Sequence, residues 1–395
     1  MNNTPELLSP AGDLDKMRFG IAYGADAVYM AGTRFGMRAA ATNFDDNALR
    51  EGIAYAHAHG VKCYITVNIM PSNRDLPALP AYLELLQDAG ADALIIADVG
   101  VLRMARRYAP KVPVHISTQT SILNHEAANY WADEGAERIV LARELSLEEI
   151  AEIRAKTPKE LEIEAFVHGA MCISYSGRCL ISQYMTGRDA NHGACAQPCR
   201  WNYSLMEEKR PGQFFPVEED GRGTYLYNSK DMCMIEHVPE LIEAGITSFK
   251  IEGRNKTAYY AACVTGAYRA AIDTYKKNPE NFVLPQFCRD EVNKVSHREY
   301  YTGFYFGNQE NGQHYGDSQY IREYEVVGMP VECDDSGKAV FALKNRFFDG
   351  EELELIQPGQ APYVFRAENV TDDEGTKREL FNVPQMRVHF AFQGQ

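Results

Sequence analysis

Long apolar runs are missing from this chain of 395 residues. No stretch approaches the roughly 20 consecutive apolar residues that a transmembrane helix needs, so we expect no membrane span. The first residues also lack a basic segment followed by an apolar one, and we therefore expect no signal peptide and a cytoplasmic location. The composition, 45% hydrophobic and 24% charged, is that of an ordinary globular protein.

Basic residues are in deficit, and the formal net charge is -15. This charge opposes nonspecific binding of nucleic acid by the whole surface, so any RNA contact requires a local basic patch. The chain has nine cysteines, an odd number, and some of them are scattered. That pattern argues against a disulfide framework.

Several common catalytic motifs are also missing from the sequence. No Gly-x-Gly-x-x-Gly follows a predicted strand, and there is no Walker-type Gly-Lys-Ser/Thr, no Gly-x-Ser-x-Gly and no His-Glu-x-x-His. A cysteine nucleophile beside His168 is conceivable, because His168 is four residues from Cys172. One nucleophile, however, does not explain five cysteines that lie close together in the sequence.

An alternation of apolar strands and amphipathic helices runs through the first two thirds of the chain. Eight strands, each followed by a helix, predict an α/β fold with a closed TIM-like (β/α)8 barrel, and an open doubly wound sheet is the alternative. A recurring Gly-Ala-Asp or Gly-Ala-Glu, beginning at Gly24, Gly90 and Gly135, indicates the same helix-to-strand turn each time. The predicted strands are 6–8, 27–30, 62–68, 93–97, 112–117, 138–142, 161–167 and 248–251.

The connection between the seventh and eighth strands is unusually long. It forms a Cys-rich insertion, 169–247, within a catalytic barrel domain, 1–278. Long insertions in compact domains are usually functional, and this one leaves the carboxyl end of a strand, where barrel enzymes place their active sites. We interpret 279–319 as a linker with helical character. Alternating apolar residues in 320–395 predict a small antiparallel β-barrel domain.

Five of the nine cysteines lie between Cys172 and Cys233. In a reducing compartment such a group is more often a metal site than a set of disulfides. Thiolates bind both zinc and iron–sulfur clusters, but only Cys195 and Cys199, with three residues between them, have a spacing typical of zinc sites. The wider spacings favour an iron–sulfur cluster, and zinc remains the alternative.

Polar and cationic residues follow the other predicted strands. Arginine binds carboxylates and phosphates through two parallel hydrogen bonds, so several cations at a barrel mouth indicate a small anionic substrate. Ordinary salt bridges with Asp98, Glu144 and Glu252 are the alternative explanation. We assign catalytic roles to His168, Lys250 and Glu252. Substrate-binding roles are assigned to Arg38, Asn68, Gln119, Arg143 and Arg254.

The segment Glu164-x-Phe166-x-x-Gly169-Ala-Met-Cys172, continued by Gly177-x-Cys179-x-Ile181-Ser182, resembles the signature of the collagenase-like peptidase family. Further matches are Glu6-Leu-Leu-Ser-Pro-Ala-Gly12, Tyr184-x-x-Gly-Arg188-x-x-Asn191, Cys195-x-x-x-Cys199-Arg200, Ser229-Lys-Asp231 and Lys250-Ile-Glu-Gly-Arg254. The resemblance covers roughly residues 5–275 strongly and the remainder more loosely. Bacterial members include tRNA wobble-uridine hydroxylases, a 23S ribosomal RNA cytidine hydroxylase and a hydroxylase pair of the ubiquinone pathway.

The resemblance implies an oxygen-independent hydroxylation, with tRNA as partner and prephenate supplying the hydroxyl group that ends on carbon five of the wobble uridine. It also implies a [4Fe-4S] cluster on Cys172, Cys179, Cys195 and Cys233, with Cys199 as a fifth candidate. Prephenate is a dicarboxylate, and from charge and strand position we expect Arg38, Arg143, Lys250 and Arg254 to bind it. The alternatives are a collagenase-like peptidase and a hydroxylase of ribosomal RNA or of a quinone precursor.

Overall fold

The computed structural model describes residues 4–37, 42–172, 174, 178–201, 204–206, 214–216, 229–307, 320–333 and 338–392. Arg38, one of the predicted substrate-binding residues, lies outside the described residues. The chain divides into two compact units, Met1–Ile321 and Arg322–Gln395.

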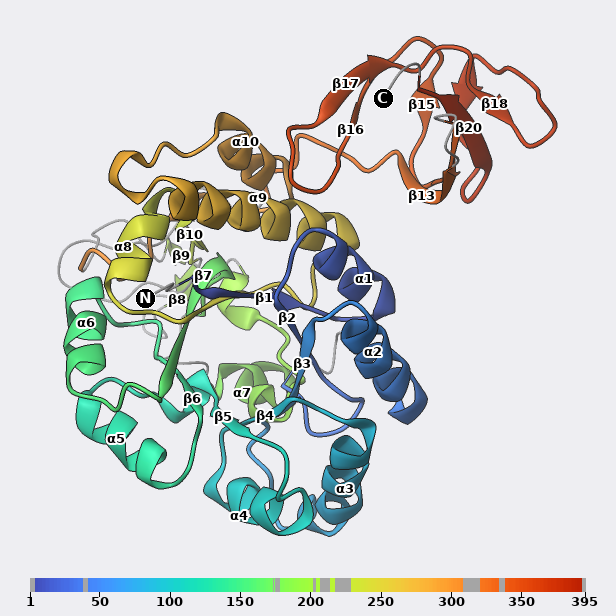
Figure 1. Ribbon diagram of the computed structural model, residues 1–395. Helices are drawn as coiled ribbons and strands as arrows, with labels where there is room; N and C mark the ends of the chain where they lie inside the picture. The colour runs from blue at the N-terminus through green and yellow to red at the C-terminus, as the bar shows by residue number, and fades with distance from the viewer. Residues whose placement is uncertain are drawn as a thin grey trace. The chain divides into compact units, whose positions relative to one another are not determined.

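The first unit is a closed barrel of eight parallel strands, as predicted (Figure 1). Each strand pairs with the next along the chain, and the last pairs with both the first and the seventh, which closes the ring. The eight strands are β1 (Glu6–Pro10), β2 (Ala27–Met30), β3 (Lys62–Val67), β4 (Ala93–Ile96), β5 (Val114–Ile116), β6 (Arg138–Val140), β7 (Glu162–Ala170) and β11 (Ser248–Ile251).

Helices surround this ring of strands (Figure 1). The long helix after the last strand, α9, packs against α1 and α10. The helices of the ring are α1 (Leu14–Ala22), α2 (Asp46–Ala58), α3 (Leu79–Ala89), α4 (Val99–Tyr108), α5 (His125–Asp133), α6 (Leu147–Ala155), α8 (Val238–Glu243), α9 (Ala258–Lys277) and α10 (Gln286–Lys294). None of the helices in the described part of the chain is long and apolar enough to cross a membrane.

Local sequence explains where many of these elements begin and end. Ser146 and Glu149 form a reciprocal capping box that satisfies backbone groups at the start of α6. The glycines of the recurring helix-to-strand turn, Gly24, Gly90 and Gly135, have φ values of 96°, 82° and 72°. Residues with a Cβ rarely adopt this left-handed conformation, so glycine is the natural choice at each of these turns.

The insertion contributes short elements to the barrel unit. β10 (Asp231–Cys233) joins the ring as an antiparallel neighbour of β7, and β12 (Tyr300–Tyr301) pairs with β10. The other described elements of the insertion are α7 (Ile181–Thr186), the 3₁₀ turns η4 (Ala190–His192), η5 (Pro198–Arg200) and η6 (Ile235–His237), and a short hairpin of β8 (Ser204–Met206) and β9 (Phe214–Pro216), in addition to α8.

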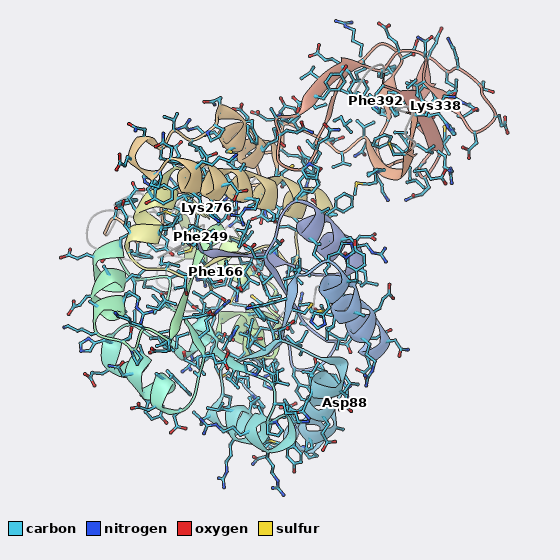
Figure 2. The ribbon with its side chains drawn as sticks, viewed as in Figure 1. Asp88, Phe166, Phe249, Lys276, Lys338 and Phe392 are labelled. Carbon is cyan, nitrogen blue, oxygen red and sulfur yellow. The ribbon has the colours of Figure 1, made fainter. Side chains whose placement is uncertain are left out.

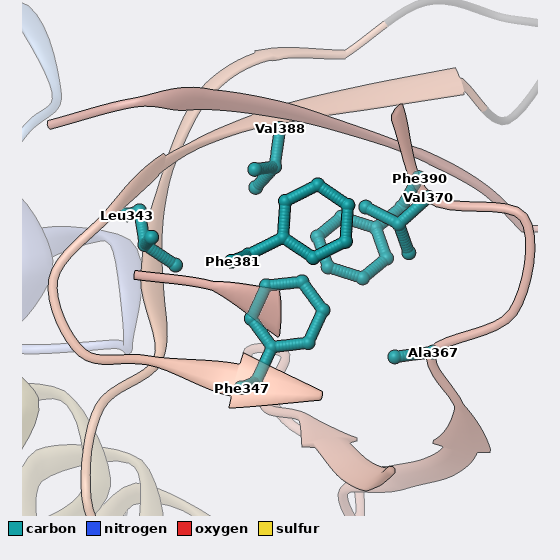
Figure 3. Close-up of a cluster of buried hydrophobic side chains, with 7 residues drawn as sticks. All are labelled: Leu343, Phe347, Ala367, Val370, Phe381, Val388 and Phe390. Carbon is teal, nitrogen blue, oxygen red and sulfur yellow. The ribbon is translucent and has the colours of Figure 1, made fainter. Parts of the chain in front are cut away.

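The second unit consists of antiparallel strands around its own apolar core. Its described strands form one four-stranded sheet, β13-β14-β20-β18, and two ribbons, β15-β19 and β16-β17, rather than one continuous ladder. The rings of Phe347 and Phe381 stack with centroids 4.8 Å apart in the centre of this core (Figure 3). The strands are β13 (Gly328–Cys333), β14 (Lys338–Leu343), β15 (Phe347–Phe348), β16 (Glu352–Leu355), β17 (Tyr363–Arg366), β18 (Thr371–Asp372), β19 (Leu380–Phe381) and β20 (Arg387–Ala391).

Candidate active site at the barrel mouth

The barrel interior contains a network of buried charges. Arg138, at the start of β6, is 2% exposed and donates to Glu6 Oε1 at 2.6 Å and to Glu164 Oε2 at 3.0 Å. The other carboxylate oxygen of Glu164 accepts from Lys250 Nζ at 2.5 Å. Glu164 thus connects the two buried cations, and each of these side chains requires the others because an unpaired charge is costly in a low-dielectric interior.

Burial and charge shift the acid–base behaviour of this network. Burial lowers the pKa of Lys250, although the carboxylate of Glu164 opposes this effect. Burial lowers the pKa of His115 well below its usual value, and the positive charges of Arg138 and Lys250 lower it further. The ammonium of Lys250 lies 4.5 Å from the centre of the Tyr29 ring and 5.5 Å from that of Phe166, which is labelled in Figure 2. A lysine held in this way is suited to proton transfer.

Two of the predicted substrate-binding residues lie close together where β3 and β5 end. The amide Nδ2 of Asn68 donates to Ser117 Oγ at 3.5 Å, and this hydroxyl donates to Gln119 Oε1 at 3.4 Å. Arg254 reaches the same end of β3, donating from Nη1 to Thr66 Oγ1 at 3.0 Å and from Nη2 to Asn43 Oδ1 at 3.3 Å.

Arg143 is held at the end of β7. Its Nη1 donates to the carbonyl of Ala170 at 3.3 Å, and its guanidinium carbon lies 5.5 Å from the centre of the Phe166 ring. Glu252, after β11, is fixed through its backbone, since its N–H donates to the carbonyl of His168 and its carbonyl accepts from Tyr260 Oη. These contacts place Arg143 and Glu252 beside the end of β7.

The structure places His168 away from Lys250. In the pairing of β7 with β11, Phe166 is opposite Lys250 and His168 is opposite Ile251, so Val167 is an extra residue that forms a bulge. A bulge reverses the side of the strand on which the next side chain lies. The His168 ring therefore packs against Tyr260 and Tyr268 of α9 and against Tyr300 of β12.

Both ring nitrogens of His168 contact tyrosine hydroxyl groups, Nε2 with Tyr300 at 3.2 Å and Nδ1 with Tyr268 at 3.4 Å. Complete burial lowers the pKa of His168 to about 3, so the imidazole is neutral at ordinary pH. These contacts are those of a buried structural histidine. The catalytic role assigned to it stays a prediction.

None of the five cysteines of the insertion, all of which lie in the described part of the chain, forms a disulfide. The described residues contain no group of three or more His, Cys, Asp or Glu side chains close enough together to hold a metal ion. Two of the thiols nevertheless suit a cluster, because Cys179 Sγ accepts the backbone N–H of Ile181 at 3.4 Å and Cys195 Sγ accepts that of Gln197 at 3.3 Å. Backbone N–H groups directed at sulfur stabilise thiolate ligands of iron–sulfur clusters.

Cys233 has different surroundings. It lies on β10 opposite His168, and burial raises the pKa of its thiol to about 12. A hydrogen bond with Tyr268 partly offsets this shift. The backbone donors at Cys179 and Cys195 are compatible with thiolate ligands. The cluster itself, and the choice between Cys199 and Cys233 as its fourth ligand beside Cys172, stay predictions.

Some residues of the site were missed by the sequence analysis. Glu164 was recognised only as part of a family signature, and Arg138 was not singled out at all. One pattern in the sequence could have identified Glu164. Glu162 and Glu164 are charged residues at alternate positions of an otherwise largely apolar strand. The partner Arg138 could not be identified, since its contacts join residues that are far apart in the sequence.

Comparison with known proteins gives the family. The sequence model of the family described as Peptidase family U32 matches residues 12–315. The sequence model of the Peptidase family U32 C-terminal domain matches residues 322–395. "tRNA hydroxylation protein P1" of Bacillus subtilis is 39% identical over 98% of this chain and 91% of its own. "tRNA hydroxylation protein P" of Escherichia coli is 37% identical over 94% of this chain and 90% of its own. "23S rRNA 5-hydroxycytidine C2501 synthase" of Escherichia coli is 40% identical over 82% of this chain and 48% of its own.

With both of its units matched in this way, the chain belongs to peptidase family U32.

Proposed function

We propose that the protein is an RNA hydroxylase that modifies carbon five of the wobble uridine in tRNA, with prephenate as the source of the hydroxyl group and with an iron–sulfur centre. The observation that carries this proposal is the near full-length similarity, at 39% and 37% identity, to relatives named tRNA hydroxylation proteins. Both units of the chain take part in that similarity, so the proposal concerns the whole protein.

The surroundings of His168 favour hydroxylation over peptide cleavage. A cysteine protease needs a histidine within hydrogen-bond reach of the thiol that it activates. In this structure the two ring nitrogens of His168 contact Tyr268 and Tyr300 instead. The contacts of His168 therefore do not support the peptidase activity that the family name implies.

The anionic co-substrate would bind through cations at the ends of the strands. Arg143 and Arg254 are held there by hydrogen bonds to Ala170 O, Thr66 Oγ1 and Asn43 Oδ1, and a fixed guanidinium binds a carboxylate with little loss of entropy. Lys250 is less suited to this task because it is already bound to Glu164 in the interior. We propose that Lys250 and Glu164 together hold or move a proton during the reaction.

The cluster would be held by Cys172, Cys179 and Cys195 with either Cys199 or Cys233. When bound, it would supply a centre for electron transfer. The backbone N–H groups of Ile181 and Gln197 would stabilise the negative charge on two of its sulfur ligands.

Omission of prephenate tests the proposal. Protein purified without oxygen is incubated with unmodified tRNA, with and without prephenate, and the nucleosides are measured by mass spectrometry. We expect 5-hydroxyuridine only when prephenate is present, because the two carboxylates of this compound match the cations at the barrel mouth. Equal product in its absence would rule out prephenate as the donor. If a parallel incubation with ribosomal RNA gave product and the tRNA gave none, the proposal would move to that substrate.

A further inference from the structure

A closed series of hydrogen bonds joins strand ends of the barrel to the insertion. Its first half runs along strand ends, from Asn68 through Ser117 to the side chain of Gln119. Its second half comes from the insertion, where Arg178 Nε donates to the carbonyl of Gln119 at 2.7 Å and Asn191 Nδ2 donates to the carbonyl of Cys179 at 3.2 Å.

One backbone hydrogen bond closes the series. Met70, two residues after Asn68, donates its N–H to the carbonyl of Asn191 at 3.1 Å. Asn68, Ser117, Gln119, Asn191 and the Arg178–Cys179 backbone are called the mouth ring below. The insertion and the ends of β3 and β5 are thus joined by hydrogen bonds, although their residues are far apart in the sequence.

Two side chains of the mouth ring carry buried polar atoms that have no hydrogen-bond partner in the described part of the chain. They are Nε2 of Gln119, a donor, and Oδ1 of Asn191, an acceptor. The Gln119 side chain is 4% exposed, and its other polar atom, Oε1, accepts from Ser117. An unpaired buried donor or acceptor destabilises a folded protein, so such atoms often serve a ligand.

The mouth ring thus carries one unpaired donor and one unpaired acceptor, the two kinds of group that the edge of a pyrimidine base pairs with. Uracil presents the carbonyl oxygen O4, which accepts, directly beside the imino group N3–H, which donates. Enzymes that modify a base take it out of the stack and identify it by hydrogen bonds to this edge. Amide side chains suit the task because they carry both kinds of group without charge.

We propose that Gln119 and Asn191 recognise the target base, with Gln119 Nε2 donating to O4 of uracil and Asn191 Oδ1 accepting from N3–H. This inference rests on the proposed function, because it requires that a base of RNA enters the barrel mouth. Gln119 and Asn191 are specificity-determining residues in this account, and they leave the chemistry to other groups.

The test measures substrate selectivity and stability in the same variants. Three anticodon stem–loop RNAs carry uridine, 3-methyluridine or cytidine at the target position, and kcat/KM for hydroxylation and the binding of each labelled RNA are determined with the full-length anaerobic protein. The variants are Gln119→Met, which removes the donor at nearly constant volume, and Gln119→Glu, which replaces the donor by an acceptor. Gln87→Glu is the matched control, since Gln87 lies at the end of α3, where its Oε1 accepts from Lys111 N.

We expect wild-type protein to prefer uridine over 3-methyluridine by about 10- to 100-fold, because the methyl group blocks the hydrogen bond to Asn191. Gln119→Met should lower kcat/KM for uridine by about tenfold or more with little change in melting temperature, because it removes an unpaired buried donor together with one long hydrogen bond from Ser117, at 3.4 Å. Gln119→Glu should shift the preference toward cytidine, whose amino group donates, and Gln87→Glu should change neither quantity.

Unchanged selectivity in both Gln119 variants would overturn the inference while leaving the proposed function intact. Wild-type protein that neither binds nor hydroxylates any of the three RNAs would contradict the proposed function itself, and the inference with it.

Discussion

Serine in place of Cys179 or Cys195 is expected to remove bound iron and to lower RNA hydroxylation by more than about 100-fold. Mutation of a residue that only supports a metal ligand already lowers metal affinity or activity by about 10- to 100-fold. A larger effect is expected here because these two cysteines are proposed as direct ligands. A serine hydroxyl remains protonated where a thiol would ionise, so it cannot replace the thiolate. The backbone N–H groups of Ile181 and Gln197 would then lose their negatively charged acceptors.

The measurement combines iron and sulfide content, the visible spectrum and hydroxylation activity of anaerobically purified protein. Wild-type protein should contain about four irons and four sulfides per chain. Cys333→Ser is the control, because Cys333 is exposed and lies in the second unit. Cys199→Ser and Cys233→Ser, compared directly, identify the fourth ligand. Full iron content in Cys179→Ser or Cys195→Ser would remove that residue from the ligand set, and one zinc without iron in wild-type protein would replace the cluster by a zinc site.

Replacement of Glu164 by glutamine is expected to destabilise the barrel unit by about 3–5 kcal/mol, the usual effect of breaking a buried ion pair from one side. Glu164 is fully buried and pairs with both Arg138 and Lys250. Glutamine preserves the volume but leaves two buried positive charges with one carboxylate fewer. Urea unfolding, followed by a signal from the barrel unit, measures the change in the free energy of unfolding.

Two further variants separate this cause from a general intolerance of substitution. Glu134→Gln is the matched control, because Glu134 pairs with Arg106 at 2.9 Å on the surface of the same unit and such pairs contribute about 1 kcal/mol or less. Adding Lys250→Met to Glu164→Gln removes one of the unpaired cations and should recover part of the loss. A Glu164→Gln protein as stable as the control would contradict the structural role of the network.

Local patterns in the sequence were sufficient to predict the barrel. Apolar strands and the left-handed glycines at Gly24, Gly90 and Gly135 are local features, and the structure confirms the closed parallel arrangement. The antiparallel strands of the second unit were predicted from simple alternation in the same way. Their division into a sheet and two ribbons depends on turns and on packing around Phe347 and Phe381, which alternation does not encode.

The candidate site could be predicted only in part, because it depends on contacts between distant residues. The carboxyl ends of parallel strands meet, and in the structure Asn68 and Gln119 are linked there through Ser117, whereas their substrate-binding role stays a prediction. The bulge at Val167 could not be foreseen, and it turns His168 toward α9. The Arg138–Glu164–Lys250 network and the bond between Arg178 and Gln119 pair residues that are 26 to 86 positions apart, and no local pattern reports such pairs.

The most direct test of the proposed function is to introduce the gene into a bacterial strain whose tRNA lacks 5-hydroxyuridine and to analyse the tRNA nucleosides by mass spectrometry. Such a host excludes redundant routes to the same modification. We expect wild-type protein to produce 5-hydroxyuridine or its derivatives, and the Cys179→Ser variant, produced at the same level, to produce none. A host tRNA that stays unmodified, although the protein is abundant and carries its iron, would contradict the assignment as a tRNA hydroxylase.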